Sequence, residues 1–283
     1  MTPVLLTKIK TSDGLTLEGI AVLPKKKSDT ALIWLHGLSS SFSRGQTLTC
    51  ELSSQCTKNN IGYFKFNTRG HDIASRSGKN IIGAGFEKFE ECVLDIHAMI
   101  RFAHSLGFKK IILAGHSTGA NKALYYVYKT RDKNIKGILL IGPISDVSTG
   151  LQTLGKKGLL RGISLAKSII KKKDAMMPSE YGILTPQRFL SLYHPGSKED
   201  VFPYHTEKAL WKELKSIRIP IAIIVGARDE YLDRPAKKLV EVFKKYAPST
   251  PKFTGITIQG ANHGFAKKEE ELSEKIINFI SKK

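Results

Sequence analysis

Cysteine is scarce in this chain of 283 residues, which contains only Cys50, Cys56 and Cys92. Their odd number argues against a disulfide framework, and their spacing matches no zinc-binding pattern. A chain of this length can bury a large core without help from disulfides or metals. We therefore expect no metal site and a reducing compartment.

Long hydrophobic runs are also absent. No segment approaches the roughly 20 apolar residues of a membrane-spanning helix, and residues 1–19 lack the apolar core behind a basic head that marks a signal peptide. We therefore expect no transmembrane segment and a cytoplasmic location. Hydrophobic residues make up 41% and charged residues 25% of the chain, a composition that excludes disordered and low-complexity proteins.

Acidic residues are few relative to basic ones. The chain has 25 Asp and Glu against 45 Lys and Arg, which gives a formal net charge of +20. The sharpest block is 150–173, which holds seven basic residues and no acidic one. No nucleic-acid motif and no interleaved aromatic residues accompany it, so we expect no nucleic-acid partner. Two explanations stay open: lysines on solvated faces, or attraction of an anionic substrate or surface.

Apolar runs that end abruptly alternate along the chain with segments of helical period. This alternation predicts a parallel sheet covered by helices on both faces. The first two runs, 3–10 and 15–23, are joined by Ser12-Asp13-Gly14, a hairpin signal. The other expected strands are 31–37, 62–70, 110–117, 136–143, 219–229 and 252–263. Helical periodicity marks 86–106, 118–130, 234–247 and 269–281.

One connection, residues 146–215, is far longer than the ordinary connection between two elements. It contains helical patches at 157–172, 186–193 and 205–214, separated by prolines. We expect residues 1–145 and 216–283 to form the core, and residues 146–215 to form a cap or lid inserted over the sheet.

The pentapeptide Gly115-His116-Ser117-Thr118-Gly119 follows an expected strand and precedes an expected helix. In that context a Gly-x-Ser-x-Gly motif puts the serine on a sharp, strained turn. A larger side chain at either glycine would clash with the neighbouring strand and helix. Ser117 is therefore the candidate nucleophile. Its hydroxyl needs a base, and the base needs an orienting carboxylate.

Candidates for the base and the acid follow the last two expected strands, at the sheet edge where ligands bind in open parallel sheets. His263 is the candidate base and Asp229 the candidate acid. Glu230 and Asp233 lie close to Asp229 in sequence, and Asp146 follows an earlier strand, so these three remain alternative acids.

An oxyanion hole needs backbone N–H donors beside the nucleophile. One candidate is the amide of Thr118, directly after Ser117. The second is the amide of Leu38, in the loop that begins with His36-Gly37 after the third strand. His36 and His116 flank this site and are candidate substrate contacts.

These motifs together resemble the α/β-hydrolase superfamily over almost the full length of the chain. The matching residues are His36-Gly37, Arg69-Gly70-His71, Gly115-His116-Ser117-Thr118-Gly119, Gly226-Ala227-Arg228-Asp229 and His263-Gly264. The resemblance implies an eight-stranded, mostly parallel sheet, a helical cap between strands six and seven, and no cofactor. It implies Ser117 as nucleophile, His263 as base and Asp229 as acid. The chain departs from the family at Asp72, where a glycine is usual.

This set of residues predicts a serine hydrolase that cleaves a carboxylic ester through an acyl-enzyme. Thioester, amide or peptide hydrolysis and acyl transfer use the same parts and remain alternatives. A non-catalytic binding module on the same fold is a further one. We expect a small-molecule ester as substrate. If that ester is anionic, the positive charge of the protein would favour its binding. We expect the protein to be a monomer or homodimer.

Overall fold

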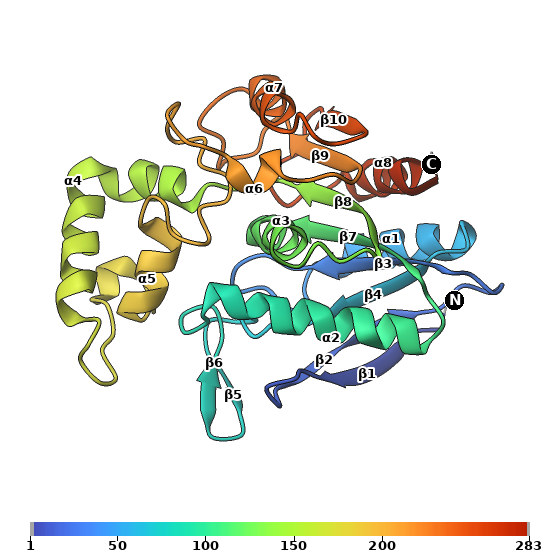
Figure 1. Cartoon of the computed structure of the whole chain (residues 1–283), viewed down its shortest axis with the longest axis horizontal. Coiled ribbons are helices and arrows are strands. Elements are labelled where there is room, and N and C mark those ends of the chain that lie inside the picture. The colour runs from blue at the N-terminus through green and yellow to red at the C-terminus, as the bar shows by residue number, and fades with distance from the viewer. Residues whose placement is uncertain (1–2, 282–283) are drawn as a thin grey trace.

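One sheet of eight strands organises the computed structural model, which describes residues 3–281 (Figure 1). The strand order is β1-β2-β4-β3-β7-β8-β9-β10. Strand β2 pairs antiparallel with both β1 and β4, and the other neighbours run parallel. This confirms the expected mostly parallel sheet. The strands are β1 (Leu5–Lys10), β2 (Thr16–Val22), β3 (Thr30–Leu35), β4 (Gly62–Phe66), β7 (Lys110–His116), β8 (Ile135–Ile141), β9 (Ile221–Gly226) and β10 (Phe253–Ile258).

The central strands are buried because helices cover both faces of the sheet. On one face, α1 (Gln46–Lys58) and α8 (Glu269–Ser281) pack through Leu52 and Ile276 against Trp34 and other side chains of the strands. The opposite face is covered by α2 (Cys92–Ser105), α3 (Thr118–Thr130) and α7 (Ala236–Tyr246). This double coverage explains why β4 and β9 are buried at every residue and consist mainly of apolar side chains.

Residues 146–215, called the cap segment below, contain α4 (Asp146–Ile169) and α5 (Pro186–Tyr193). Between them lies the short 3-10 turn η2 (Ser179–Tyr181). Figure 1 shows α4 and α5 beyond the ends of the strands, at the edge of the molecule. They enclose a hydrophobic cluster of their own, with Leu159, Phe189 and Leu192 among its members.

The last part of the cap segment packs differently. Phe202, Trp211 and Leu214 belong to the cluster between the sheet and α7. Helix α6 covers only Lys212–Lys215, so the helix expected over 205–214 is wrong for most of its length. Trp211 has a left-handed backbone (φ 49°), and its ring stacks on Tyr246 at 4.8 Å. Tertiary burial of the indole therefore overrides the local helical pattern.

A short hairpin of β5 (Ser75–Ser77) and β6 (Asn80–Ile82) follows β4 and was not expected from the sequence. The helix expected over 86–106 begins later, with the 3-10 turn η1 (Phe89–Glu91) leading into α2. Within residues 3–281, no helix is both long enough and apolar enough to span a membrane.

Candidate active site

The three candidate triad residues follow neighbouring strands at one edge of the sheet. Ser117 lies between β7 and α3, Asp229 follows β9, and His263 follows β10. Because β7, β8, β9 and β10 are parallel and adjacent in the sheet order, their carboxyl ends meet at that edge. The topology thus brings together residues that lie up to 146 positions apart in the sequence.

Ser117 occupies the strained turn that the pentapeptide predicts. Its backbone has φ 57° and ψ −129°, a region that non-glycine residues rarely adopt. A Cβ on Gly115 would lie 2.1 Å from the Gly119 carbonyl oxygen, and one on Gly119 would lie 2.4 Å from the Leu35 carbonyl oxygen. The glycines are therefore required by contact with backbone. The Ser117 amide donates to the Ile141 carbonyl at 2.9 Å, which ties the turn to β8.

His263 and Asp229 are joined by a hydrogen bond of 2.8 Å between Nδ1 and Oδ2. The other carboxylate oxygen, Oδ1, accepts the Tyr231 amide at 3.0 Å. Both side chains are buried, so Asp229 is held in one orientation and has no need of a solvent partner. This bond assigns the proton to Nδ1 of His263 and leaves Nε2 as the ring nitrogen that can accept a proton.

The three alternative acids make other contacts or lie in a different environment. Oε2 of Glu230 accepts a hydrogen bond of 3.0 Å from the backbone amide of His263 and so helps to fix the backbone of this residue. Asp233 pairs with Arg234. Burial, followed by repulsion from Glu199, raises the pKa of Asp146 well above its ordinary value, which favours a neutral carboxyl rather than an orienting carboxylate.

His116 connects His263 to the turn that carries Ser117. Its Nε2–H donates to the carbonyl oxygen of His263 at 2.8 Å, and the two ring centroids are 4.9 Å apart. Burial, with a smaller effect from His263, lowers the pKa of His116 to about 4, so the ring is neutral at pH 7. A Cβ on Gly142, next to the Ser117 acceptor Ile141, would lie 3.2 Å from Cε1 of His263. These contacts place the His263 ring beside the turn that carries Ser117.

The candidate oxyanion loop passes directly over Ser117. A Cβ on Gly37 would lie 2.9 Å from Cβ of Ser117, so the backbone leading into Leu38 approaches the nucleophile as closely as a glycine permits. Thr118 is the first residue of α3, where backbone N–H groups have no partner within the helix. The side chain of Leu38 packs against the α4–α5 cluster, so the loop also contacts the cap segment.

His36 holds the oxyanion loop through both ring nitrogens. Nδ1–H donates to the Gly37 carbonyl at 2.9 Å, and Nε2 accepts the Thr68 amide at 3.0 Å. Burial, with a smaller effect from Lys122, lowers the pKa of His36 to about 3, which keeps the ring neutral. The sequence suggested that His36 and His116 contact the substrate. Their bonds within the protein instead lead us to propose that both position loops.

A buried ionic network beneath this loop was missed by sequence reasoning. Nζ of Lys122, on α3, lies 2.8 Å from Oε2 of Glu87 and 3.2 Å from Oγ1 of Thr68. Nη2 of Arg188, on α5, lies 2.9 Å from Oε1 of Glu87, and the Arg188 guanidinium also pairs with Glu199. Burial alone would raise the pKa of Glu87, but Lys122 and Arg188 outweigh it and lower the pKa. The network therefore joins α3 to the cap segment through ionised groups.

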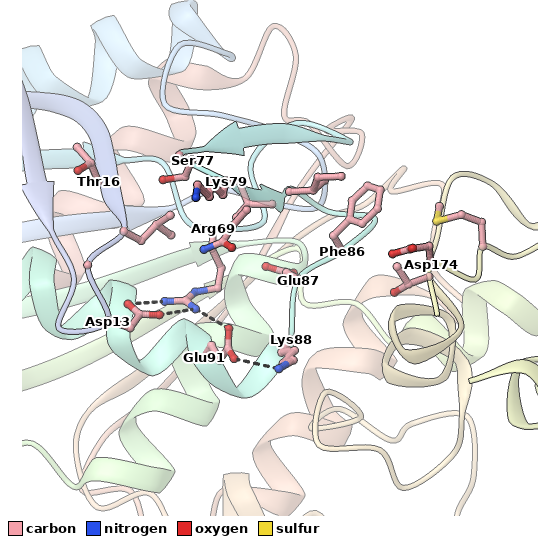
Figure 2. A pocket seen from close by; sticks show the side chains of 18 of the residues that line it. Asp13, Thr16, Arg69, Ser77, Lys79, Phe86, Glu87, Lys88, Glu91 and Asp174 are labelled. Carbon is pink, nitrogen blue, oxygen red and sulfur yellow. Dashed lines mark hydrogen bonds and ion pairs between the residues drawn. The ribbon is translucent and has the colours of Figure 1, made fainter. Parts of the chain in front are cut away.

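The Arg69-Gly70-His71 stretch is structural in the same way. A Cβ on Gly70 would lie 1.9 Å from Oε2 of Glu87, so this glycine makes room for the network. Arg69 pairs with Asp95 at 2.9 Å and with Asp13 at 3.1 Å. Figure 2 shows Arg69 in the wall of a cleft of about 1150 Å³ between the β5–β6 hairpin, the β1–β2 turn and residues 174–176. Its charge is therefore used to fix the loop after β4.

Comparisons with solved structures show the same fold in several esterases. The esterase Pf2001 of Pyrococcus furiosus has a TM-score of 0.67 and 18% identity, covering 99% of this chain and 91% of that one. The carboxylesterase CesB (YbfK) of Bacillus subtilis has a TM-score of 0.60 and 17% identity, covering 99% and 93%. Est1E of Butyrivibrio proteoclasticus, solved with ferulic acid bound, has a TM-score of 0.63 and 16% identity, covering 97% and 98%.

Sequence comparisons give a curated relative and a family. A Mycoplasma genitalium protein named "Putative esterase/lipase 3" is 23% identical over an alignment of 175 residues that covers 57% of this chain. The chain spans only 59% of the length of that relative. A family model described as "Protein of unknown function (DUF1749)" matches residues 75–281. The chain therefore belongs to the DUF1749 family, and its structure has the α/β-hydrolase fold.

Proposed function

We propose that this protein is a serine hydrolase that cleaves a carboxylic ester, with Ser117 as nucleophile, His263 as base and Asp229 as orienting acid. The observation that carries the proposal is the 2.8 Å bond between Nδ1 of His263 and Oδ2 of Asp229. It is buried and lies beside a serine in a strained turn. A structural serine would not need this backbone conformation or a histidine held in one tautomer. The names of two structural neighbours, an esterase and a carboxylesterase, and of the relative "Putative esterase/lipase 3" are consistent with this proposal.

The reaction follows from the positions of these groups. Nε2 of His263 accepts the Ser117 hydroxyl proton as Oγ attacks the ester carbonyl. The Leu38 and Thr118 amides stabilise the resulting oxyanion. The same histidine then protonates the departing alcohol, which leaves an acyl-enzyme. Water, deprotonated by His263, attacks this intermediate and releases the acid with Ser117 restored.

We also propose that the cap segment, residues 146–215, governs access to Ser117 and selects the ester, while residues 1–145 and 216–283 carry the catalytic groups. Two observations support this proposal. The α4–α5 cluster is separate from the clusters of the sheet, and Leu38 of the oxyanion loop packs against it. Thioester and amide hydrolysis and acyl transfer use the same groups, so the substrates that fit beneath the cap segment decide between them.

The test is covalent labelling of the purified protein with a fluorophosphonate, followed by intact mass measurement. We expect one adduct on the parent protein and none on Ser117→Ala, because only an activated serine reacts. Ser105→Ala removes an exposed serine at the end of α2, outside the candidate site; it serves as the matched control and keeps the adduct. A p-nitrophenyl ester series of increasing acyl length then defines the substrate range. A folded parent protein that forms no adduct and hydrolyses no ester would refute the proposal.

A further inference from the structure

Helix α4 presents an exposed basic face on the outside of the cap segment. Gly155 (φ 66°, ψ 164°) interrupts the helix, and the part that follows exposes Lys156, Lys157, Leu160, Arg161, Ser164, Lys167 and Ser168. At 3.6 residues per turn these positions fall within an arc of about 140°. The opposite side of the helix carries Leu159, Ile163 and Ala166, which are buried in the α4–α5 cluster. The exposed arc therefore forms one continuous surface.

Positive charge is concentrated on this surface to a degree found nowhere else in the sequence. Residues 150–173 contribute seven of the net 20 positive charges and contain no acidic residue. Lys171, Lys172 and Lys173 continue the exposed series directly after the helix. None of these lysines forms an ion pair with another residue in the described range 3–281. The Tyr181 side chain and, to a smaller extent, the charge of Glu180 raise the pKa of Arg161, which stays positively charged.

A large apolar side chain stands in the middle of the charged arc. Leu160 is 56% exposed, and Lys156 and Lys157 precede it by four and three residues, so both lie on its side of the helix. Lysines can direct their ammonium groups upward while their methylene chains lie along an apolar surface. A basic helix face with an exposed leucine can combine electrostatic attraction to anionic lipids with burial of an apolar side chain, the two contributions that hold peripheral helices at a membrane.

We propose that this face of α4 docks the protein on a membrane surface that contains anionic lipids. Charge complementarity selects the partner, and Leu160 distinguishes lipid from nucleic acid, since hydrocarbon accepts a leucine and a phosphate backbone does not. The face carries no aromatic side chain on which a base could stack. Figure 1 shows α4 at the edge of the molecule farthest from β10 and α8, so a flat membrane can approach it without meeting the sheet.

The test is sedimentation of the full-length protein with vesicles of phosphatidylglycerol and phosphatidylcholine, against vesicles of phosphatidylcholine alone. We expect binding to the anionic vesicles only, and its loss between 0.1 M and 1 M NaCl, where the Debye length falls from about 10 Å to about 3 Å. The triple variant Lys156→Gln, Lys157→Gln, Lys167→Gln should bind about a hundredfold more weakly, at about fivefold per lysine. Leu160→Gln should weaken binding about fivefold.

The matched control removes the same charge from another lysine-rich helix. Lys237, Lys238 and Lys244 are exposed on α7, and their change to Gln should leave vesicle binding within about twofold. Equal loss in both triple variants, binding to phosphatidylcholine alone, or displacement from vesicles by duplex DNA with no effect of Leu160→Gln would each overturn the proposal. Ser117→Ala should bind vesicles like the parent protein, so failure of docking and failure of catalysis are separate results.

Discussion

The geometry of the ion pair between Lys122 and Glu87 predicts how much the free energy of unfolding falls when the pair is broken. Both side chains are at most 2% exposed, and their charged atoms are 2.8 Å apart. Replacing Lys122 with Met keeps the volume and the straight chain but removes the charge. Breaking a buried pair in this way usually destabilises a protein by about 3–5 kcal/mol, because the remaining charge is left in a medium that solvates it poorly.

The loss should be near the lower end of that range. Glu87 keeps its second partner, since Nη2 of Arg188 lies 2.9 Å from Oε1, so its charge is not left wholly unpaired. We expect Lys122→Met to lower the free energy of unfolding by about 3 kcal/mol, a large part of the roughly 5–15 kcal/mol of a typical domain. Lys129→Met, on the exposed side of the same helix, should change it by less than about 0.5 kcal/mol.

Urea unfolding followed by circular dichroism measures these differences, and a double-mutant cycle isolates the pair. Glu87→Gln alone should also be strongly destabilising. The double variant should be less destabilised than the sum of the two single variants by about 2 kcal/mol, since neither then leaves an unpaired partner. Additive losses, or a loss below about 1 kcal/mol for Lys122→Met, would show that the pair contributes nothing specific and would refute the reasoning.

Three further predictions concern the site itself. Asp229→Asn should leave the unfolding midpoint nearly unchanged but lower kcat for a p-nitrophenyl ester by a factor on the order of 10⁴, because the His263 tautomer is no longer fixed; an unaltered kcat contradicts this. Gly119→Ala should destabilise by about 1–3 kcal/mol and abolish labelling of Ser117, since the new Cβ would meet the Leu35 carbonyl at 2.4 Å. The pKa of His36, about 3 in the folded protein, means that only the unfolded chain binds this proton between pH 6.5 and 3. Stability should therefore fall on acidification by up to about 1.4 kcal/mol per pH unit from this residue, and His36→Asn should show a shallower fall between pH 7 and 5 in urea midpoints.

Much of the fold follows from local patterns in the sequence. The apolar runs and helical periods report burial that each segment experiences on its own, and their alternation indicates a parallel sheet covered by helices on both faces. The glycines around Ser117 could also be interpreted from sequence, because the clash they avoid lies within the same strand–turn–helix unit and its neighbouring strand. Patterns of this kind depend mainly on residues close together in the chain, so they can be recognised in a single sequence.

The buried polar contacts could not be predicted in that way. The ionic network draws on four separate segments, which supply Glu87, Lys122, Arg188 and Glu199. The spacing of charged residues along a chain does not show which of them form ion pairs. Lys122 is the one residue with a local signal, since a lysine interrupts the otherwise uncharged and buried run from Thr118 to Val127. The same limit applies to His36, whose acceptor role depends on the amide of Thr68, 32 residues away.

The network also restricts how a substrate can reach Ser117. Arg188 donates through Nε to the Ala84 carbonyl at 2.9 Å, and the Thr185 amide donates to the Gly85 carbonyl at 2.9 Å. Lifting α5 from the core would therefore expose two backbone carbonyls and separate buried charges, at several kcal/mol. Among residues 3–281, no residue of α4 takes part in a buried ion pair, and Gly155 interrupts the helix nine residues after its start. We therefore expect the movement that admits the proposed ester substrate to take place in α4. Helix α5 and the candidate oxyanion loop should keep their positions relative to Ser117.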